Sequence, residues 1–448
     1  MLDKKSGDKM SKLLELKEFE TVIANPDFKE EYKCMDKKYF KYLTEFIRTF
    51  DSNNESDVLN FIKIGYKRNI GETVTFNNYV GLIQIKNNYQ IQILPKIDFI
   101  NNDKEKTKQV FIKMLRSMKD FPSKVFTNAN LKIERMNLYE IFINMYLQEV
   151  KELVRCGIKS SYEDHEDNLT VYKGKLIVNK HIRINLTHRE RFYVSFDEYQ
   201  VNGPENRLLK STLLKLKNIS GSAENSKEIK SLLTFFELVE PSKNYYKDFS
   251  KVIIDRNTRS YETIMKWSKV FLLNKSFTTF SGTNNARALL FPMEKVFESY
   301  VARNMKKVFN RKNWEVSSQD RGHYLFETLN GKNHKKFAIR PDLVVIRTDN
   351  SIVILDTKWK KVINDKGKNY GISQADMYQM YAYSKKYNTS ETWLLYPLND
   401  DMKDSGRITF DSGDGSRVSL FFVDVANIED SMEELLSILS SDKPVILE

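Results

Sequence analysis

The chain has 448 residues, 41% of them hydrophobic and 29% charged, which is typical of a globular protein of two or three domains and excludes a disordered chain. Its longest apolar runs, 351–355 and 419–425, are too short to cross a bilayer, and the first residues lack the apolar core of a secretory signal. The net charge of +12 and the pI near 9.2 favour a polyanionic partner, although an AT-rich genome that favours lysine codons would give the same excess.

Cysteine and histidine are scarce. Cys34 and Cys156 provide no disulfide framework, which fits a reducing environment, so we expect a cytoplasmic protein without a membrane segment. The five histidines and two cysteines show no zinc-binding spacing. Any metal site is therefore expected to hold a hard cation through carboxylates.

The first part of the chain is predicted to change from helix to strand. Residues 1–60 should form a charged helical extension, with helices over 12–20 and 37–47. Short β-rich runs separated by Asn-Asn turns at 77–78 and 87–88 then predict strands. These strands cover residues 73–76, 80–85 and 89–94.

The middle of the chain is predicted to be mostly helical, interrupted by one basic segment at 169–200. Helical spacing over 104–156 defines a set of core positions. These are Leu138, Ile141, Phe142, Met145 and Val150. A further helix should begin at Glu205, and a helical hairpin should cover 227–275 after a loop at 221–226.

The basic segment contains six Lys or Arg residues, two histidines and one acid between Lys173 and Arg191. Because desolvating unpaired charges is costly, this segment must meet solvent, DNA or acidic groups of a partner. The sequence has no phosphate-binding loop, so the chain is not expected to hydrolyse nucleotides itself. A Gly- and Asn-containing stretch at 281–285 is predicted to mark the boundary of the C-terminal third.

Two β runs in that third, 343–346 and 352–355, flank a polar turn and predict a hairpin. If the turn centres on Asp349, Asp342 and Asp356 fall directly opposite each other, with Cβ atoms about 4.5–5.5 Å apart. Like charges so placed are destabilising unless a positive group lies between them, and a divalent cation is the natural candidate. A solvated surface hairpin is the alternative, but Asp356 ends an apolar strand.

Lys358 lies two residues beyond Asp356 and should project from the same face of the strand. There its ammonium can hold an attacking water or stabilise charge on a phosphate. A metal held by the carboxylates would polarise the phosphoryl oxygen and generate the nucleophile.

Two predicted helices flank the hairpin. The helix before it carries Glu294 and Glu298, which share a face and either of which could supply a further acidic ligand. The helix after it begins at the expected N-cap Ser373 and carries Gln379 and Tyr383, also on one face. Amide and phenol groups there would suit a DNA backbone, unless Tyr383 is a core aromatic.

The predicted fold has three parts. Residues 1–60 form the helical extension, and 61–280 form an α+β region with a β-rich domain and helices, to which the family resemblance described below assigns partner binding. Residues 281–448 form an α/β domain in which a mixed sheet is flanked by helices.

The motif residues resemble a known family. Pro341-Asp342, Asp356-Thr-Lys358 and Gln379-x-x-x-Tyr383 resemble the PD-(D/E)XK nuclease motif of RecB-like nucleases. Segments along roughly 60–425 narrow the resemblance to the McrC family, the nuclease subunits of McrBC-type and LlaJI-type restriction systems. These segments are Tyr79-Val-Gly-Leu-Ile, Ile91-Gln-Ile-Leu-Pro95-Lys96, Lys173-Gly-Lys-Leu, His181-Ile-Arg-Ile-Asn185 and Gly203-Pro-Glu-Asn206-Arg207.

The resemblance implies a type II/IV-like restriction endonuclease subunit that acts in antiviral defence. It implies magnesium, with manganese as the alternative, and cleavage of double-stranded DNA. It assigns Glu298, Asp342, Asp356 and Lys358 to the nuclease motif, the first three as metal ligands. It also implies a projecting finger that engages a hexameric McrB-like AAA+ GTPase, whose DNA recognition and GTP hydrolysis precede cleavage.

The candidate finger is the basic segment, in which Arg183, Arg189 and Arg191 could organise partner residues around the nucleotide. Two other functions are considered. A stand-alone PD-(D/E)XK nuclease would cut DNA with magnesium alone. A non-catalytic adaptor would only stimulate a GTPase, but it has no reason to keep opposed carboxylates.

Overall fold

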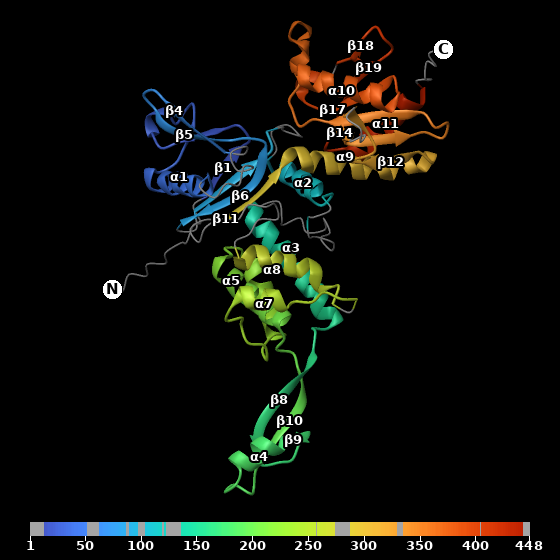
Figure 1. Ribbon diagram of the computed structural model, residues 1–448. Coiled ribbons are helices and arrows are strands. Elements are labelled where there is room, and N and C mark those ends of the chain that lie inside the picture. The colour runs from blue at the N-terminus through green and yellow to red at the C-terminus, as the bar shows by residue number, and fades with distance from the viewer. Residues whose placement is uncertain are drawn as a thin grey trace. The chain divides into compact units, whose positions relative to one another are not determined.

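The computed structural model describes residues 13–51, 62–86, 89–96, 104–118, 121, 136–256, 258–273, 287–328, 335–403 and 405–441. The chain divides into two compact units, coloured along the sequence in Figure 1. We call residues 122–287 the helical unit, and residues 12–121 with 288–448 the sheet unit. None of the helices in the described ranges is both long enough and apolar enough to span a membrane.

The sheet unit begins with two four-stranded sheets. The first has the order β1 (Leu13–Lys17), β7 (Tyr89–Leu94), β6 (Tyr79–Ile85) and β11 (Arg287–Pro292). The second has the order β3 (Lys33–Cys34), β2 (Thr21–Ile23), β5 (Gly71–Phe76) and β4 (Ile62–Lys67). The helices α1 (Lys37–Asp51) and α2 (Lys104–Leu115) accompany them, with a short 3-10 helix, η1 (Pro26–Phe28).

The predicted helix over 12–20 is wrong, because the described residues 13–20 form strand β1 and the turn after it. β1 pairs in parallel with β7, and its residue Leu16 is buried. Pairing with a distant strand overrides a charged sequence whose local pattern favours a helix. The helix predicted over 37–47 is confirmed as α1.

The three predicted strands after residue 70 are confirmed as β5, β6 and β7. They do not pair in sequence order as one antiparallel meander, which the Asn-Asn turns between them favoured. β6 and β7 pair antiparallel, as expected of neighbours. β5 pairs with β2 and β4 instead, so the turn at 77–78 connects two sheets and not a hairpin. The turn at 87–88 lies outside the described residues.

The C-terminal part of the sheet unit is a mixed six-stranded sheet with helices. Its order is β12 (Glu315–Ser318), β15 (Leu343–Ile346), β16 (Ile352–Thr357), β17 (Glu391–Pro397), β19 (Arg417–Val423) and β18 (Thr409–Asp411). The helices are α9 (Met293–Phe309), α10 (Gln374–Tyr387) and α11 (Ile428–Ser441). Smaller elements are β13 (Tyr324–Glu327), β14 (Lys335–Ala338), η5 (Asn310–Lys312), η6 (Lys366–Gly371) and η7 (Asp400–Met402). The mixed sheet flanked by helices agrees with the α/β prediction.

Alternation along the strands gives this sheet two buried faces. Val344, Ile354 and Leu394 pack in one core with Met380 and Tyr383 of α10. The neighbouring residues in each strand point to the other face of the sheet, where α9 and α11 pack together. Figure 1 shows α10 and α9 on different sides of the strands.

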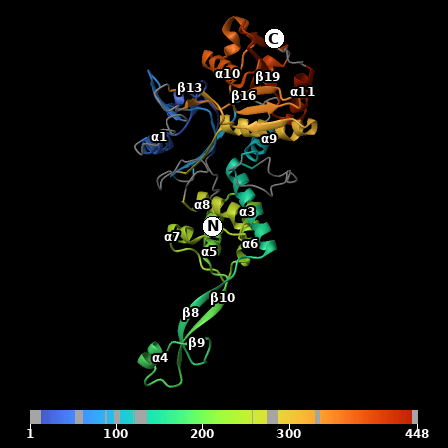
Figure 2. The ribbon, with the colours of Figure 1, turned by 45° about the vertical axis from the view of Figure 1, so that its right-hand side comes forward.

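The helical unit carries a long hairpin. Its helices are α3 (Leu138–Cys156), α5 (Pro204–Ile219), α6 (Ala223–Thr234), α7 (Tyr245–Lys251) and α8 (Tyr261–Leu273). The five predicted core positions of α3 are all buried. The hairpin contains β8 (Ser161–Leu169), β9 (Lys175–Leu176), α4 (Val178–Ile184) and β10 (Phe192–Gln200), and it projects from the helices in Figure 2.

The boundaries of the middle region differ in detail from the prediction. The hairpin starts at residue 161, before the segment predicted from residue 169. The sequence did not reveal its first strand, β8, because that strand is rich in acids and lacks apolar alternation. The helix expected at Glu205 is confirmed as α5, whereas α6 already begins at Ala223, inside the predicted loop. The expected boundary at 281–285 lies outside the described residues. Residues 62–96 share one compact unit with the C-terminal sheet.

Candidate active site

The predicted hairpin register is confirmed. Leu343 pairs with Leu355, and Val345 pairs with Val353, so Asp342 and Asp356 follow at the same end of strands β15 and β16. The turn is closed by hydrogen bonds from the Arg347 amide to the Ser351 carbonyl and from the Asn350 amide to the Arg347 carbonyl. The register therefore brings together two acids that are 14 residues apart in the chain.

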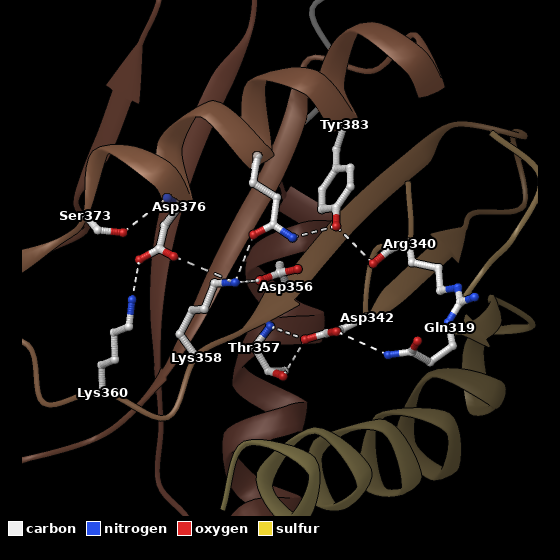
Figure 3. Close-up of polar contacts among 11 residues, drawn as sticks. Gln319, Arg340, Asp342, Asp356, Thr357, Lys358, Lys360, Ser373, Asp376 and Tyr383 are labelled. Carbon is white, nitrogen blue, oxygen red and sulfur yellow. Dashed lines mark hydrogen bonds and ion pairs between the residues drawn. The ribbon is translucent and has the colours of Figure 1, made fainter. Parts of the chain in front are cut away.

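Asp342 is held by the residue that follows the second acid. The backbone amide and the hydroxyl of Thr357 donate to its Oδ2 at 2.8 and 2.7 Å (Figure 3). Burial raises the pKa of Asp342, whereas the Thr357 hydrogen bonds and the charge of Lys358 oppose the rise. Thr357 thus orients the Asp342 carboxylate and partly compensates its loss of solvation.

Asp356 is almost fully buried, with 2% of its surface exposed. The ammonium of Lys358 lies 2.7 Å from its Oδ2. Burial and the neighbouring charge of Asp342 raise the pKa of Asp356 to about 7, against the attraction of Lys358. A carboxyl group poised near neutrality in this way is sensitive to any cation that approaches it.

Lys358 lies on the same side as Asp356, as predicted from their spacing. Besides its ion pair, its Nζ donates to Oε1 of Gln379 at 2.9 Å and lies 3.8 Å from Oδ1 of Asp376. Burial disfavours the charged form, but the Asp356 carboxylate outweighs that effect and raises the pKa of Lys358. The ammonium is therefore charged and held by groups from two elements.

Helix α10 presents Gln379 and Tyr383 to this ammonium. Gln379 Nε2 donates to the Tyr383 hydroxyl at 2.7 Å, and that hydroxyl donates to the Arg340 carbonyl at 2.9 Å. Tyr383 is buried, so its aromatic ring belongs to the core while its hydroxyl fixes Gln379. Ser373 caps the helix as predicted, accepting from the Asp376 amide at 3.2 Å. The DNA contacts predicted for Gln379 and Tyr383 stay predictions.

Of the two glutamates on α9, the structure brings only Glu298 to the aspartates. Gln319 Nε2 donates to Glu298 Oε1 at 2.7 Å and to Asp342 Oδ1 at 3.4 Å. Burial and the charge of Asp342 raise the pKa of Glu298 to about 7. Glu294 is exposed and accepts a hydrogen bond from Asn78 instead.

Several residues of the site were not predicted. Thr357 lies between the motif residues Asp356 and Lys358, so its position in the sequence was a signal that it belongs to the site. Asp376 forms an ion pair with Lys360 at 2.8 Å, and this hydrogen bond lowers its pKa against the effect of burial. Gln319 lies in a turn at a positive φ of 56° and has no signal in the sequence.

A buried contact joins the site to the first sheet of the same unit. Trp359, which follows Lys358, donates from Nε1 to Oε2 of Glu18 at 3.0 Å. The Trp359 ring also lies 5.4 Å from the ring of Phe297, the neighbour of Glu298. Glu18 is 3% exposed, and burial raises its pKa. Trp359 therefore connects the segment after Lys358 to Glu18 and to the helix that carries Glu298.

The acids fit a hard divalent cation by their chemistry. Oxygen ligands suit magnesium, and a bound cation would offset the burial and the like-charge repulsion that raise the pKa values of Glu298 and Asp356 to about 7. Within the described ranges, no three acidic, histidine or cysteine side chains converge closely enough to form a metal cluster. Asp342 is turned to Thr357 and Asp356 to Lys358, so the fit rests on donor type and charge.

The residues predicted to act on a partner lie in the other unit. Arg183 is in α4, and Arg189 and Arg191 follow it before β10, at the tip of the hairpin. All three are exposed, as are the nearby Ile182 and Leu186. Exposure of this basic tip agrees with the expectation that it is not buried in a core.

Comparison with known proteins gives a family and a fold. The chain matches the model of the family described as McrBC 5-methylcytosine restriction system component over residues 74–397. A chain from an assembly of Thermococcus gammatolerans McrB AAA+ hexamers with bound McrC is similar at 18% identity, covering 95% of this chain and all of its own length, with a TM-score of 0.70. A chain of the Thermococcus gammatolerans McrBC complex is 20% identical and covers 65% of this chain and 86% of its own length, with a TM-score of 0.48. No curated protein matches.

Proposed function

This chain belongs to the McrC family of McrBC restriction system components, and from that premise we propose that it is the subunit that hydrolyses phosphodiester bonds in double-stranded DNA. One observation carries the proposal. The hairpin register places Asp342 and Asp356 at one strand end, with the Lys358 ammonium 2.7 Å from the second acid. The C-terminal sheet with its helices is then a PD-(D/E)XK nuclease domain.

Asp342, Asp356 and Glu298 would hold the magnesium, with manganese as a substitute. When bound, the cation supplies Lewis acidity at the phosphoryl oxygen and lowers the pKa of a water. Thr357 fixes the Asp342 carboxylate, and Gln319 links that carboxylate to Glu298. These neighbours orient the acids before any cation arrives.

Lys358 supplies a positive hydrogen-bond donor where charge develops on the phosphate. Its position depends on Gln379, whose amide is in turn fixed by the Tyr383 hydroxyl. Gln379 is partly exposed and can contact a DNA backbone, whereas Tyr383 acts through it. Phosphate contacts of this kind position a strand without reading its sequence.

We further propose that the hairpin of the helical unit docks into an AAA+ GTPase ring. The similar chain from Thermococcus gammatolerans is described in a complex with such hexamers, which supports this assignment. Arg183, Arg189 and Arg191 are exposed near the tip, which supports the proposal that an inserted tip brings them to partner residues near the nucleotide. The chain would then stimulate GTP hydrolysis and cleave DNA after docking.

Asp356→Ala tests the catalytic assignment. It removes a ligand and a buried negative charge, so cleavage should fall by about three orders of magnitude, since a bound cation contributes several kcal/mol to the transition state. Cleavage is measured in single turnover with magnesium, GTP and the GTPase, and partner binding should persist. A near wild-type cleavage rate would overturn the active-site assignment.

A further inference from the structure

A polar cleft of the sheet unit lies between α2, α9 and the start of α11. It has a volume of about 740 Å³. Its cationic side chains come from two helical segments, with Lys113 and Arg116 at the end of α2 and Arg303 and Lys307 on α9. The acids in its lining are Glu429 and Asp430. Cations thus outnumber acids in this cleft.

The two arginines are held close together. Arg303 Nη1 donates to the carbonyl of Arg116 at 2.9 Å, which ties α9 to the end of α2. Burial and the charge of Arg303 lower the pKa of the Arg116 guanidinium. The charge of Arg303 acts on the Arg116 side chain in this cleft, and an anion bound there would interact favourably with both arginines. Lys307 forms an ion pair with Glu429 at 2.6 Å.

The cleft is separate from the carboxylate site. At 3.6 residues per turn, Arg303 and Lys307 point to the side of α9 that lies away from Glu298. The helix itself, about 10 Å across with its side chains, stands between the two places. A group bound in the cleft would therefore not be a ligand of the carboxylates.

We propose that this cleft binds the phosphodiester backbone of the DNA at a distance from the point of cleavage. The inference rests on the proposed function for the identity of the polymer. The cations are spread along two helical segments at i,i+3 and i,i+4 spacing, about 5–6 Å between Cβ atoms, and so can meet successive phosphates. Asn304, Asn427 and Ser117 add neutral side chains of the kind that contact phosphate oxygens.

This arrangement assigns the cleft an effect on affinity and not on chemistry. Arginine matches phosphate oxygens with a planar fork of donors, so Arg116 and Arg303 should contribute most. Each phosphate contact releases counterions and adds about 0.9 to the slope of log affinity against log salt. The salt slope therefore counts the contacts directly.

The test measures DNA binding by the variant Arg116→Gln/Arg303→Gln through the fluorescence anisotropy of a labelled duplex. The titrations contain a metal chelator and are repeated over a range of potassium chloride concentrations. The salt slope should decrease by about 1.8, and affinity should fall roughly tenfold at moderate salt. Single-turnover cleavage at saturating DNA, with the GTPase present, should be unchanged. Lys113→Gln, which leaves the bond between Arg303 and the Arg116 carbonyl intact, should lower the slope by about 0.9.

Arg48→Gln/Lys67→Gln is the matched control, because it removes the same charge from α1 and β4. An equal loss of slope in this control, or a wild-type slope in both cleft variants, would overturn the proposal. So would binding of inorganic phosphate that depends on the arginines while DNA affinity does not. Asp356→Ala should keep the wild-type salt slope, so failure of the cleft and failure of the nuclease assignment are told apart.

Discussion

The carboxylate site and the hairpin tip hold their charges in opposite environments. In the sheet unit, Asp356 is buried and its pKa is raised to about 7 beside Asp342. In the helical unit, Arg183, Arg189 and Arg191 are exposed at the end of a hairpin. Buried like charges persist only if a cation or proton offsets them, whereas exposed cations need no such compensation. The first arrangement supports the proposed reaction centre, and the second is compatible with the proposed docking surface.

The largest effect after the loss of Asp356 is expected at Lys358. Lys358→Ala should lower the cleavage rate by about 10²–10³-fold, the usual cost of one donor at a developing charge. Metal affinity should change little, because the ammonium acts on water or phosphate. Isothermal titration with manganese measures that affinity, and its loss would show that Lys358 instead maintains the carboxylates.

The docking surface should respond in a different assay. Arg183→Gln/Arg189→Gln/Arg191→Gln should reduce stimulation of the partner GTPase by roughly tenfold, less than the 10³–10⁵ of a direct arginine finger, if the tip acts through partner residues. The variant should keep its metal affinity and its melting temperature. GTP hydrolysis at saturating partner measures the effect, and wild-type stimulation would exclude this tip as the finger.

The buried acids also predict that the stability of the sheet unit depends on pH. Asp356 and Glu298 titrate near 7 in the folded chain, above their usual values. The folded state then holds protons that the unfolded state has released, so without metal the free energy of unfolding should decrease as pH rises from about 4 through 7.

Added magnesium should raise the melting temperature more at about pH 8 than at about pH 5, because it binds the ionised carboxylates. Glu298→Gln/Asp356→Asn should flatten the metal-free dependence. Scanning calorimetry across this range checks both, and a wild-type profile in the double variant would contradict the shared environment of these acids.

A smaller effect is expected from the residue that positions Gln379. Tyr383→Phe keeps the buried ring but removes the hydroxyl that fixes the Gln379 amide. We expect DNA affinity and cleavage to fall severalfold, with a change in stability of about 1 kcal/mol. Gln379→Ala should reproduce the loss of affinity. Unchanged activity in Tyr383→Phe would limit Tyr383 to the core.

The two regions also differ in what their sequence could reveal. The hairpin register follows from a turn and two apolar runs, so the pairing that places Asp342 and Asp356 together was predictable from local residues. Gln319 could not be found this way, because its contacts with Glu298 and Asp342 arise only when a turn meets α9. Strand β1 was missed for the same reason, since its partner β7 lies more than 70 residues away.

At the hairpin of the helical unit, sequence predicts exposure but not extent. The basic charge of 173–191 indicated a surface segment, and the exposed arginines agree. The acidic strand β8 has no pattern that distinguishes it from a loop, and only its pairing with β10 defines it. The partner of an exposed tip leaves no local signature, so that identification depends on the family.

One experiment measures both regions at once: GTP hydrolysis and DNA cleavage recorded on the same sample of chain, GTPase, magnesium and duplex. The wild type should cleave well only with the GTPase and GTP. Asp356→Ala should lose cleavage and keep stimulation, whereas the triple arginine variant should show reduced stimulation and reduced cleavage. Robust cleavage by the wild type without the GTPase would contradict the dependence of cleavage on docking. Stimulation lost together with Asp356 would contradict a catalytic site separate from the docking surface.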